Sequence, residues 1–459
     1  MKCTNKTDGG RKRAAEFVNK EISTVKEGKS IKRVYYQTLG CKVNSYETDA
    51  IRTLFESRGF ITTEKAEECD VYVVNTCTVT AEADRKSRQM LRRAHKLAPH
   101  AIVAAMGCLG EIRCIDDLAD ISVGTKRRSV LVDRVIGRIS DRACDIFESG
   151  GEYEEFGPIV SREGTRAFIK IQDGCDNFCS YCIIPYVRGR ARSRTPEEVV
   201  REIRRLGEKG YCEVVFTGIN LSSYGKQWGL PSEALKSLLN ETSRIDSVRR
   251  IRLGSLEPNL INENFVAFLS ETEKFCRHLH ISLQSGSDSV LFRMNRKYGT
   301  AEFTQAVSLL RAAMPGISIT TDIIVGFPGE TDSEHRESIH YCEKTGFSKI
   351  HVFPYSVREG TSAARMKLRV DPSVKNQRTR EFLALSDRSS EQSLTGMVGK
   401  TVSVLVESSI ENKRYSGYSR DYHRVCFAAS NTPRPGTEHF VRIDGFDKDI
   451  LLGEEVISL

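Results

Sequence analysis

The alternation of hydrophobic and polar residues changes its period along the chain, and each change marks a predicted folding unit. In the first unit, the apolar runs VYYQTL, VYVVNT and AIVAAM alternate with helix-like segments near residues 46–58 and 80–97. Short apolar runs separated by amphipathic stretches are typical of parallel strands joined by helices. We therefore predict a small doubly wound α/β domain over residues 32–142.

A glycine- and acid-rich connection, residues 143–160, leads into the second predicted unit, residues 161–394. Six strand candidates follow, each with a helical stretch behind it: AFIKIQ, EVVFTG, RIRLGS, HLHISLQ, SITTDIIVGF and KIHVFPYS. Six such units are too few for a closed eight-stranded barrel, so they predict an open or partial (βα)6 barrel. A helix from about Pro372 to Ser393 closes this unit, and active residues are expected after the strand ends.

The pattern at the two ends of the chain differs from that of the α/β units. From Gly396 the sequence changes to alternating, turn-rich segments such as TVSVLVE, HRVCFAA and HFVRIDGF, which predict a small antiparallel β-barrel over residues 395–459. Residues 1–31 are rich in Lys, Arg, Gly, Ser and Thr without a sustained period, which is typical of a flexible basic tail. A tail that contacts RNA and a tail without a role both remain open.

Composition narrows the class of protein further. Hydrophobic residues at 39% and charged residues at 28% are ordinary for a soluble protein, and no apolar run is long enough to span a bilayer. The basic N-terminus has no apolar stretch behind it, as a secretory signal requires. We therefore expect a cytoplasmic protein without a membrane partner. In that compartment the 14 cysteines favour metal or redox chemistry over structural disulfides.

One cysteine set lies directly after the first strand of the predicted barrel. The segment Gln172 to Cys182 contains Cys175, Cys179 and Cys182, which are separated by four and then three positions. Three thiolates in one loop can bind three irons of a [4Fe-4S] cubane and leave the fourth iron without a protein ligand. A structural zinc site normally needs a fourth ligand, and no cysteine or histidine follows closely.

A second cysteine set is spread along the N-terminal unit. Cys41, Cys77 and Cys108 each follow one of its three predicted strands. Because ligands of an open parallel sheet bind at the carboxyl ends of the strands, we expect these cysteines to converge and bind a second, auxiliary [4Fe-4S] cluster. Three independently buried cysteines are the alternative. No chemistry is assigned to the remaining cysteines, which are Cys3, Cys69, Cys114, Cys144, Cys212, Cys276, Cys342 and Cys426.

The C-x3-C-x-aromatic-C arrangement of the first set resembles the radical S-adenosylmethionine (SAM) superfamily. The resemblance implies that the open iron chelates the amino and carboxylate groups of SAM, and that an electron from the cluster cleaves the sulfonium to a 5′-deoxyadenosyl radical. The same resemblance suggests the following residues for cofactor binding: Tyr181, Gly218, Ser255, Glu257, Ser282, Gln284, Ile324 and Gly326. Plain roles in turns or helix caps are the alternative for each of them.

Two three-cysteine sets followed by a β-barrel resemble the methylthiotransferase family, from about Lys32 to Leu459. The segment Thr38 to Asn44 is similar to the branch that acts on N6-threonylcarbamoyladenosine at position 37 of transfer RNA, as are residues 183–190, 280–288 and 322–331. The resemblance implies that a second SAM donates its methyl to sulfur on the auxiliary cluster, with no catalytic residues beyond the clusters. Glu111, where members often have Gln, and the longer basic tail are departures from the family pattern.

RNA binding would require basic and aromatic side chains. Arg188, Arg190, Arg192 and Arg194 alternate, so an extended segment would place four guanidiniums on one side, suited to phosphates; structural ion pairing is the alternative. The C-terminal unit resembles a TRAM module, and its cations and aromatics could bind loop bases and phosphates. Its candidate RNA-binding residues are Lys413, Arg414, Tyr418, Arg420, Tyr422 and Arg424.

These features predict an enzyme that methylthiolates threonylcarbamoyladenosine in the anticodon loop of tRNA, acting as a monomer with an electron donor such as flavodoxin or ferredoxin. Isopentenyladenosine in tRNA and a ribosomal protein are alternative substrates within the same enzyme class. A non-enzymatic RNA-binding protein whose cysteines hold zinc is the alternative from another class.

Overall fold

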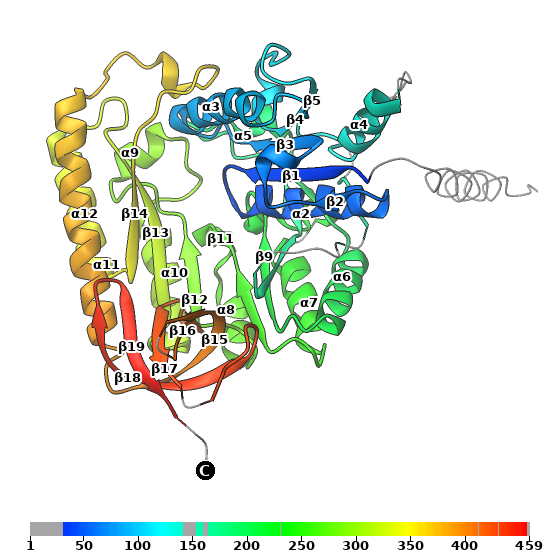
Figure 1. The fold of residues 1–459 in the computed structure, drawn as a ribbon. Coiled ribbons are helices and arrows are strands. Elements are labelled where there is room, and N and C mark those ends of the chain that lie inside the picture. The colour runs from blue at the N-terminus through cyan, green and yellow to red at the C-terminus, as the bar shows by residue number, and fades with distance from the viewer. Residues whose placement is uncertain are drawn as a thin grey trace, which may run out of the picture.

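The computed structural model describes residues 31–140, 153–157, 159, 164–229, 231–411, 413–429 and 431–456. The predicted basic tail except Ile31, most of the predicted connection, Cys3 and Cys144 lie outside the described residues. Figure 1 shows three units: an N-terminal α/β unit beside the upper ends of the central strands, the central strands with their helices, and a C-terminal barrel below. The α/β class and all three predicted architectures are confirmed, with one change in the C-terminal barrel given below.

The N-terminal sheet has five parallel strands in the order β2-β1-β3-β4-β5. They are β1 (Arg33–Thr38), β2 (Ile61–Thr62), β3 (Val71–Thr76), β4 (Ile102–Gly107) and β5 (Ile121–Val123). Apolar residues of α2 (Lys42–Ser57) and α4 (Val130–Ser140) share one core cluster with the sheet, and those of α3 (Ala81–Leu97) share another. The sheet is therefore doubly wound, and its order reverses between β1 and β3, where ligands of such sheets bind.

The central unit is a curved parallel sheet. Its strands are β6 (Arg166–Lys170), β9 (Glu213–Thr217), β10 (Arg250–Leu253), β11 (Ser255–Leu256), β12 (His278–Ile281), β13 (Ser318–Val325) and β14 (Lys349–Pro354). β10 pairs with β9, whereas β11, one residue further along, pairs with β12. The two short strands thus join two sheets into a partial barrel of six positions, in which β6 and β14 are not paired with each other.

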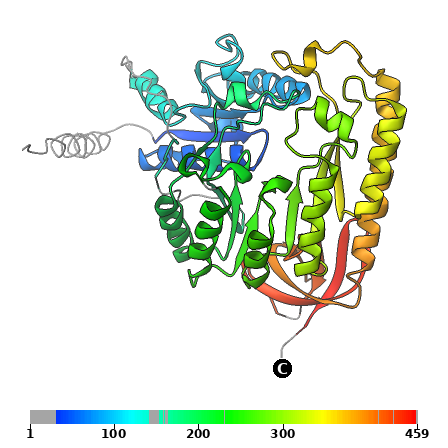
Figure 2. The same ribbon diagram turned by 180° about the vertical axis from the view of Figure 1, so that it is seen from behind.

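Helices cover the outer face of the central strands, as Figure 2 shows from behind. They are α6 (Pro196–Glu208), α7 (Pro231–Ser243), α8 (Glu263–Glu271), α9 (Asp288–Arg293), α10 (Thr300–Ala313), α11 (Asp332–Thr345) and α12 (Pro372–Thr395). The short helix α5 (Ile184–Val187) instead lies beside the N-terminal unit, where Val187 packs with Cys108 (Figure 1). A short hairpin of β7 (Gln172–Asp173) and β8 (Arg192–Ser193) flanks the cysteine loop. Short 3-10 turns complete the connections: η1 (Ala66–Glu68), η2 (Leu109–Glu111), η3 (Leu221–Ser223), η4 (Lys226–Trp228), η5 (Pro258–Leu260) and η6 (Ala363–Arg365).

The side chains of the central strands alternate between the two faces of the sheet. Leu279 and Ile281 of β12, with Ile319 and Ile323 of β13, belong to the largest apolar core, which includes residues of the outer helices. The intervening positions on the same strands are polar and line an internal cavity. Because successive residues of a strand point to opposite faces, one sequence pattern builds both the core and a polar interior.

The C-terminal unit is a closed five-stranded barrel in the order β15-β16-β17-β19-β18. Its strands are β15 (Thr401–Ile410), β16 (Arg414–Ser419), β17 (Arg424–Ala428), β18 (Glu438–Asp447) and β19 (Ile450–Glu455). The prediction of antiparallel pairing is right except at one place, because β17 and β19 pair in parallel. The barrel lies against the amino ends of the central strands, where Arg250 and Arg252 of β10 donate hydrogen bonds to carbonyls of the barrel segment 418–420.

Helices that could cross a bilayer were sought among the described residues, and none there is both long enough and apolar enough.

Candidate active site

The second cysteine set lies at one edge of the N-terminal sheet. Cys41 precedes α2 and follows β1, Cys77 follows β3, and Cys108 follows β4. Cys41 and Cys77 flank the point where the strand order reverses. Gly40 has a φ of 107°, and a Cβ added there would lie 3.1 Å from the sulfur of Cys77, so glycine lets the first loop approach the second. The structure thus brings together thiols that lie far apart in the sequence.

Burial and the mutual proximity of these thiols shape their chemistry. Burial raises the pKa of Cys77 to about 11, and the neighbouring thiols of Cys108 and Cys41 add to this rise. Burial also raises the pKa of Cys108, while the guanidinium of Arg188 opposes the effect. Thiols in this setting lose their protons to solvent readily only when a metal binds, because the metal stabilises the thiolate.

Polar side chains tie the three cysteine loops together. The Asn44 side chain donates to the carbonyls of Leu39 (2.7 Å) and Thr76 (3.1 Å), so it joins the loops after β1 and β3. The Thr76 hydroxyl donates to the carbonyl of Met106 (2.8 Å) and thereby links the ends of β3 and β4. Sequence reasoning did not single out Asn44, although it lies three residues after the first cysteine.

The first cysteine set forms a compact loop between β7 and α5. The backbone N–H of Cys182 donates to the carbonyl of Cys179 (2.9 Å), and that of Cys175 donates to Gly189 (3.1 Å). Burial raises the pKa of Cys182 to about 12, and the nearby thiol of Cys179 adds to it. Gly174 has a φ of 69°, and a Cβ there would lie 2.0 Å from the carbonyl oxygen of Arg190, so this position requires glycine.

Glu257 is the centre of a polar cluster beside this loop. It is only 8% exposed, and its carboxylate accepts hydrogen bonds from Asn177 (2.8 Å to each oxygen), Asn220 (3.3 Å) and Arg296 (2.7 Å). Arg296 also donates to the sulfur of Cys179 at 3.1 Å. Arg296 therefore joins the Cys179 thiol to the Glu257 carboxylate and fixes the cysteine loop against the polar cluster. Arg296 lies more than 100 residues after the loop, and no local signal identified it.

The other residues expected to bind the cofactor lie around the upper ends of the central strands. Gly218 and Ser255 line the internal cavity, and Tyr181 and Ile324 pack against one small apolar cluster. Gln284 has a φ of 75°, rare for a residue with a side chain, and its backbone bridges to Asp322 and Ile324 of β13. The backbone N–H of Ser282 donates to Leu256, and that of Gly326, which has a φ of 69°, donates to Glu330.

An internal cavity of about 850 Å³ is lined by all three units of the chain. Gly40, Cys41 and Lys42 reach it from the N-terminal unit, and the TRAM-like barrel contributes a segment around residues 418–424. The central strands line it with a hydrogen-bonded series of side chains: His278 to Thr320 (3.2 Å), Thr320 to His280 (3.0 Å) and His280 to Asp322 (3.1 Å). Such a polar interior contrasts with the apolar filling of closed eight-stranded barrels.

Only one of the four alternating arginines, Arg190, is exposed, and it lies 3.3 Å from the Asp176 carboxylate. Arg188 and Arg194 are 1% and 2% exposed, and they form ion pairs with buried carboxylates. Arg192 is half-buried near Asp173, whereas Arg190 is exposed. The expectation of four guanidiniums on one side is therefore wrong for Arg188 and Arg194, because the segment folds back against α2 and α6 instead of lying on the surface.

The candidate RNA-binding residues of the C-terminal barrel fall into two groups. Lys413 and Arg414 are exposed at the turn between β15 and β16, and Arg424 is exposed beside the cavity. Tyr418 and Tyr422 are half-buried and stacked, with ring centroids 4.9 Å apart. Tyr422 also lies under the guanidinium of Arg252 at 4.6 Å, so it packs between the barrel and the central strands. Arg420 likewise donates to two carbonyls of the central unit.

Glu111, the departure from the family pattern, has a defined role. Its carboxylate accepts from the backbone N–H of Thr125 at 2.6 Å, and the Thr125 hydroxyl donates to the carbonyl of Val187 at 2.7 Å. This contact joins the N-terminal unit to the segment after the first cysteine loop.

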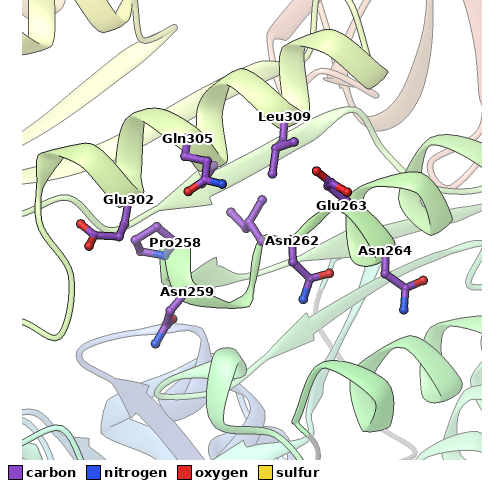
Figure 3. Close-up of a pocket in the computed structure, with 10 residues that line it drawn as sticks. Pro258, Asn259, Asn262, Glu263, Asn264, Glu302, Gln305 and Leu309 are labelled. Carbon is purple, nitrogen blue, oxygen red and sulfur yellow. The ribbon is translucent and has the colours of Figure 1, made fainter.

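A second cavity, of about 530 Å³, lies on the outer side of the central unit between η5, α8 and α10 (Figure 3). Its walls include asparagines and glutamates, and Glu302 there accepts from the backbone N–H of Gly299 as a helix cap. None of the residues predicted for a site lines it.

Both cysteine sets suit cluster ligands. Each offers three neighbouring, unpaired thiols, with Arg296 beside one set and Arg188 beside the other. Within the described ranges, no three His, Cys, Asp or Glu side chains are grouped closely enough to hold one metal ion. The ligands of a cubane bind different iron atoms, so they surround a larger volume than the ligands of a single ion.

Comparisons with known proteins define first the class and then the family. Residues 169–342 match the radical SAM superfamily, and residues 33–122 match uncharacterized protein family UPF0004. The fold is similar to that of the radical SAM methyltransferase TsrM from Kitasatospora setae, with a TM-score of 0.53 and 18% identity over 71% of this chain and 75% of that one. The cobalamin-dependent radical enzyme OxsB gives a TM-score of 0.52 at 9% identity over 81% of this chain and 57% of that one.

Whole-chain similarity is greater among the methylthiotransferases. The threonylcarbamoyladenosine tRNA methylthiotransferase MtaB of Bacillus subtilis is 39% identical over 86% of this chain and 90% of its own length. That of Chlamydia pneumoniae is 36% identical over 91% and 97%. The tRNA-2-methylthio-N(6)-dimethylallyladenosine synthase of Acetivibrio thermocellus is 32% identical over 89% and 88%. The chain therefore belongs to the radical SAM methylthiotransferase family of enzymes, which implies SAM and a [4Fe-4S] cluster as cofactors.

Proposed function

We propose that this enzyme methylthiolates N6-threonylcarbamoyladenosine at position 37 in the anticodon loop of tRNA. Two relatives named for threonylcarbamoyladenosine are 39% and 36% identical, and synthases named for dimethylallyladenosine reach 35%. Identity in this range does not separate the two substrates alone. The observation that carries the choice is the chemistry of the internal cavity.

The cavity suits a polar modification better than a hydrocarbon one. Its walls carry the cations Lys42 and Lys349, together with histidine and hydroxyl side chains and the carboxylate of Asp322. Apolar side chains such as Leu253 and Phe353 also line it, between these polar groups. The threonylcarbamoyl group bears a carboxylate, a hydroxyl and amide N–H groups, all of which need partners when they leave water. An isopentenyl group has no such needs and would gain most from an apolar pocket.

The six cysteines are assigned to two clusters. Cys175, Cys179 and Cys182 would bind the cluster that holds SAM, and Cys41, Cys77 and Cys108 would bind an auxiliary cluster. When bound, these cofactors supply a carbon radical and a methylthio group, with the methyl from a second SAM. The protein positions them: Glu257, Asn177, Asn220 and Arg296 order the first loop, while Asn44 and Thr76 order the second set.

We also infer that both cysteine sets lie within reach of one substrate base. Cys41 lines the cavity directly, and Gly218 and Ser255 line it at the strand ends beside the first cysteine loop. Holding reacting groups in one enclosed space lowers the entropic cost of reaction. A single adenosine that enters from the side of the C-terminal barrel could therefore reach both centres.

We assign tRNA contacts to the exposed cations Arg190, Lys413, Arg414 and Arg424. Exposed lysine and arginine side chains bind phosphates without sequence preference. An electron donor such as flavodoxin or ferredoxin would supply the reducing electron. The enzyme would act as a monomer in the cytoplasm, where its tRNA substrate is found.

The test is mass spectrometry of tRNA nucleosides from cells that lack this protein, compared with the same cells supplied with it. The proposal expects the 2-methylthio derivative of threonylcarbamoyladenosine only when the protein is present. Methylthiolation of isopentenyladenosine instead would show that the substrate assignment is wrong. No change in any tRNA nucleoside would direct the search to ribosomal proteins.

A further inference from the structure

We propose that Arg188 is a positioning residue that sets the auxiliary cysteine loops against the first cysteine loop. The inference rests on the proposed auxiliary cluster at Cys41, Cys77 and Cys108. It concerns the geometry between the two centres and not the identity of the nucleoside.

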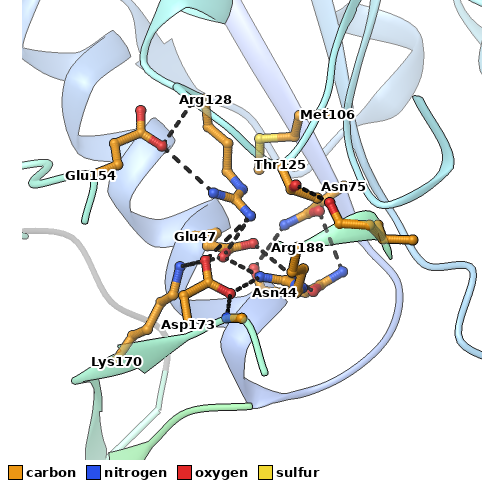
Figure 4. A network of polar contacts seen from close by, with 12 residues as sticks. Asn44, Glu47, Asn75, Met106, Thr125, Arg128, Glu154, Lys170, Asp173 and Arg188 are labelled. Carbon is orange, nitrogen blue, oxygen red and sulfur yellow. Dashed lines mark hydrogen bonds and ion pairs between the residues drawn. The ribbon is translucent and has the colours of Figure 1, made fainter. Parts of the chain in front are cut away.

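The Arg188 side chain contacts both units at once (Figure 4). One terminal nitrogen donates to the Asn44 side-chain oxygen at 2.8 Å. The other donates to Glu47 at 2.9 Å and to Asp173 at 3.0 Å. Asn44 and Glu47 belong to α2, directly after Cys41, whereas Asp173 lies two residues before Cys175.

Each partner of Arg188 is itself bonded to a cysteine loop. Asn44 donates to the carbonyls of Leu39 and Thr76, which precede Cys41 and Cys77 by two residues and one residue. The carboxylate of Asp173 accepts from the backbone N–H of Gly174, next to Cys175. A displacement of the guanidinium would therefore shift the auxiliary cysteine loops as well as the first cysteine loop.

The segment that carries Arg188 also touches the third auxiliary cysteine. Cys108 is 2% exposed and packs against Ile183 and Val187, and Ile183 directly follows Cys182. One stretch of seven residues, 182–188, thus begins at a cysteine of the first set, packs on a cysteine of the second and ends at Arg188. Thr125, held by Glu111, binds the carbonyl of Val187 and reinforces this stretch.

The rest of the charge network can hold the interface without Arg188. Lys170 donates to Glu47 and to Asp173, at 2.7 Å each, and Arg128 lies 3.0 Å from Glu47 and 3.9 Å from Asp173. Both carboxylates therefore keep buried cations when Arg188 is replaced. The replacement removes the planar guanidinium, whose two terminal nitrogens hold Asn44 and Asp173 at a fixed separation. A lysine ammonium cannot bind both residues with this geometry.

The experiment compares Arg188→Lys with a matched control, Arg194→Lys, in the full chain reconstituted with iron and sulfide. Arg194 is equally buried and ion-paired with Glu202 and Glu155. It donates to the Tyr46 hydroxyl of α2 at 3.2 Å, but its contacts do not include Asn44 or Asp173, the residues bonded to the cysteine loops. Three quantities are measured for each variant: 5′-deoxyadenosine formed, methylthiolated nucleoside formed, and hydrogen–deuterium exchange of residues 39–44.

For Arg188→Lys, we expect 5′-deoxyadenosine formation within about twofold of the wild type and a methylthiolated product reduced by at least roughly tenfold, since small misplacements of reacting groups are costly. Amide exchange over residues 39–44 should accelerate. Arg194→Lys should change neither the ratio of the two products nor this exchange. The inference is overturned if both variants lose the two products in equal proportion, or if exchange near Cys41 is unchanged in Arg188→Lys.

A charge-balanced double variant covers the case in which Arg188→Lys does not fold. Replacing Glu47 by Gln and Arg188 by Met removes one buried charge of each sign and preserves side-chain volume. The same uncoupling of cleavage from methylthiolation is expected, and a wild-type product ratio would overturn the inference. The ratio of methylthiolated nucleoside to 5′-deoxyadenosine is measured with whichever adenosine accepts the methylthio group. If the proposed substrate is wrong, a different nucleoside carries the methylthio group, but the effect of Arg188 on this ratio remains the same.

Discussion

Replacement of Glu47 by Gln tests how strongly the buried charges hold the N-terminal unit to the central one. The Glu47 carboxylate is fully buried and forms ion pairs with Lys170 (2.7 Å), Arg188 (2.9 Å) and Arg128 (3.0 Å). Two of these cations come from outside the N-terminal unit. A glutamine keeps the shape of the side chain but leaves the three cations with one less negative charge.

The loss of stability in Glu47→Gln can be derived in two ways, from the pKa of the carboxyl group and from the general cost of breaking a buried ion pair, and the two values agree. Burial raises the pKa of Glu47, but Arg128, Arg188 and Lys170 outweigh it and lower the pKa from 4.5 to about 2. A shift of this size corresponds to about 3 kcal/mol of stability from the charged form. Removing one partner of a buried ion pair typically costs about 3–5 kcal/mol. We therefore expect Glu47→Gln to lower the free energy of unfolding by about 3 kcal/mol at pH 7.

The stability difference between the wild type and Glu47→Gln should depend on pH in a defined direction. The folded-state pKa is depressed, so the contribution of Glu47 is fully present above its unfolded value and is lost as pH falls toward the folded one. Urea unfolding of both proteins, followed by circular dichroism under reducing conditions, should show a difference that shrinks by roughly 1 kcal/mol between pH 7 and pH 3.5.

The control is Glu68→Gln, which removes a half-buried carboxylate at the surface that is paired with Lys65 and Arg33. Surface pairs of this kind contribute little to stability, so no measurable change is expected. A loss below about 1 kcal/mol in Glu47→Gln at pH 7, well under the usual cost of breaking a buried pair, would refute the reasoning. A difference that grows on acidification would refute it as well.

Three further predictions concern the cofactors and RNA. Cys179→Ala should abolish reductive SAM cleavage, whereas Cys77→Ala should preserve cleavage and lose methylthiolation; equal loss of cleavage in both would contradict the division between the two sets. Gly174→Ala should lower the iron content and SAM cleavage, because the added Cβ would meet a backbone oxygen at 2.0 Å, and a wild-type iron content would count against this account. Lys413→Glu with Arg414→Glu should weaken tRNA binding at least about tenfold in filter-binding assays and flatten its salt dependence, while unchanged binding would remove these cations from the tRNA surface.

Much of the architecture follows from local sequence patterns. The apolar runs before Cys41, Cys77 and Cys108 predict parallel strands. The structure has parallel strands there, with bounds that agree to within one residue, and all three cysteines lie beyond the carboxyl ends of these strands. The spacing of Cys175, Cys179 and Cys182 is equally local, since all three belong to one loop. Such features can be predicted because strand period and loop spacing depend on neighbours in the sequence.

Tertiary structure decided the environment of the charged and aromatic residues. Arg188 belongs to the same alternating series as the exposed Arg190, so the sequence pattern does not distinguish the two. Its partner Glu47 is 141 residues away, and only the packing of the two units brings them together. Arg296 reaches Cys179 across 117 residues, and Tyr422 packs between two units instead of standing free. The parallel pairing of β17 with β19 is likewise a matter of barrel closure. Contacts between distant segments leave no periodic signal, because their energy depends on which surfaces meet and not on local spacing.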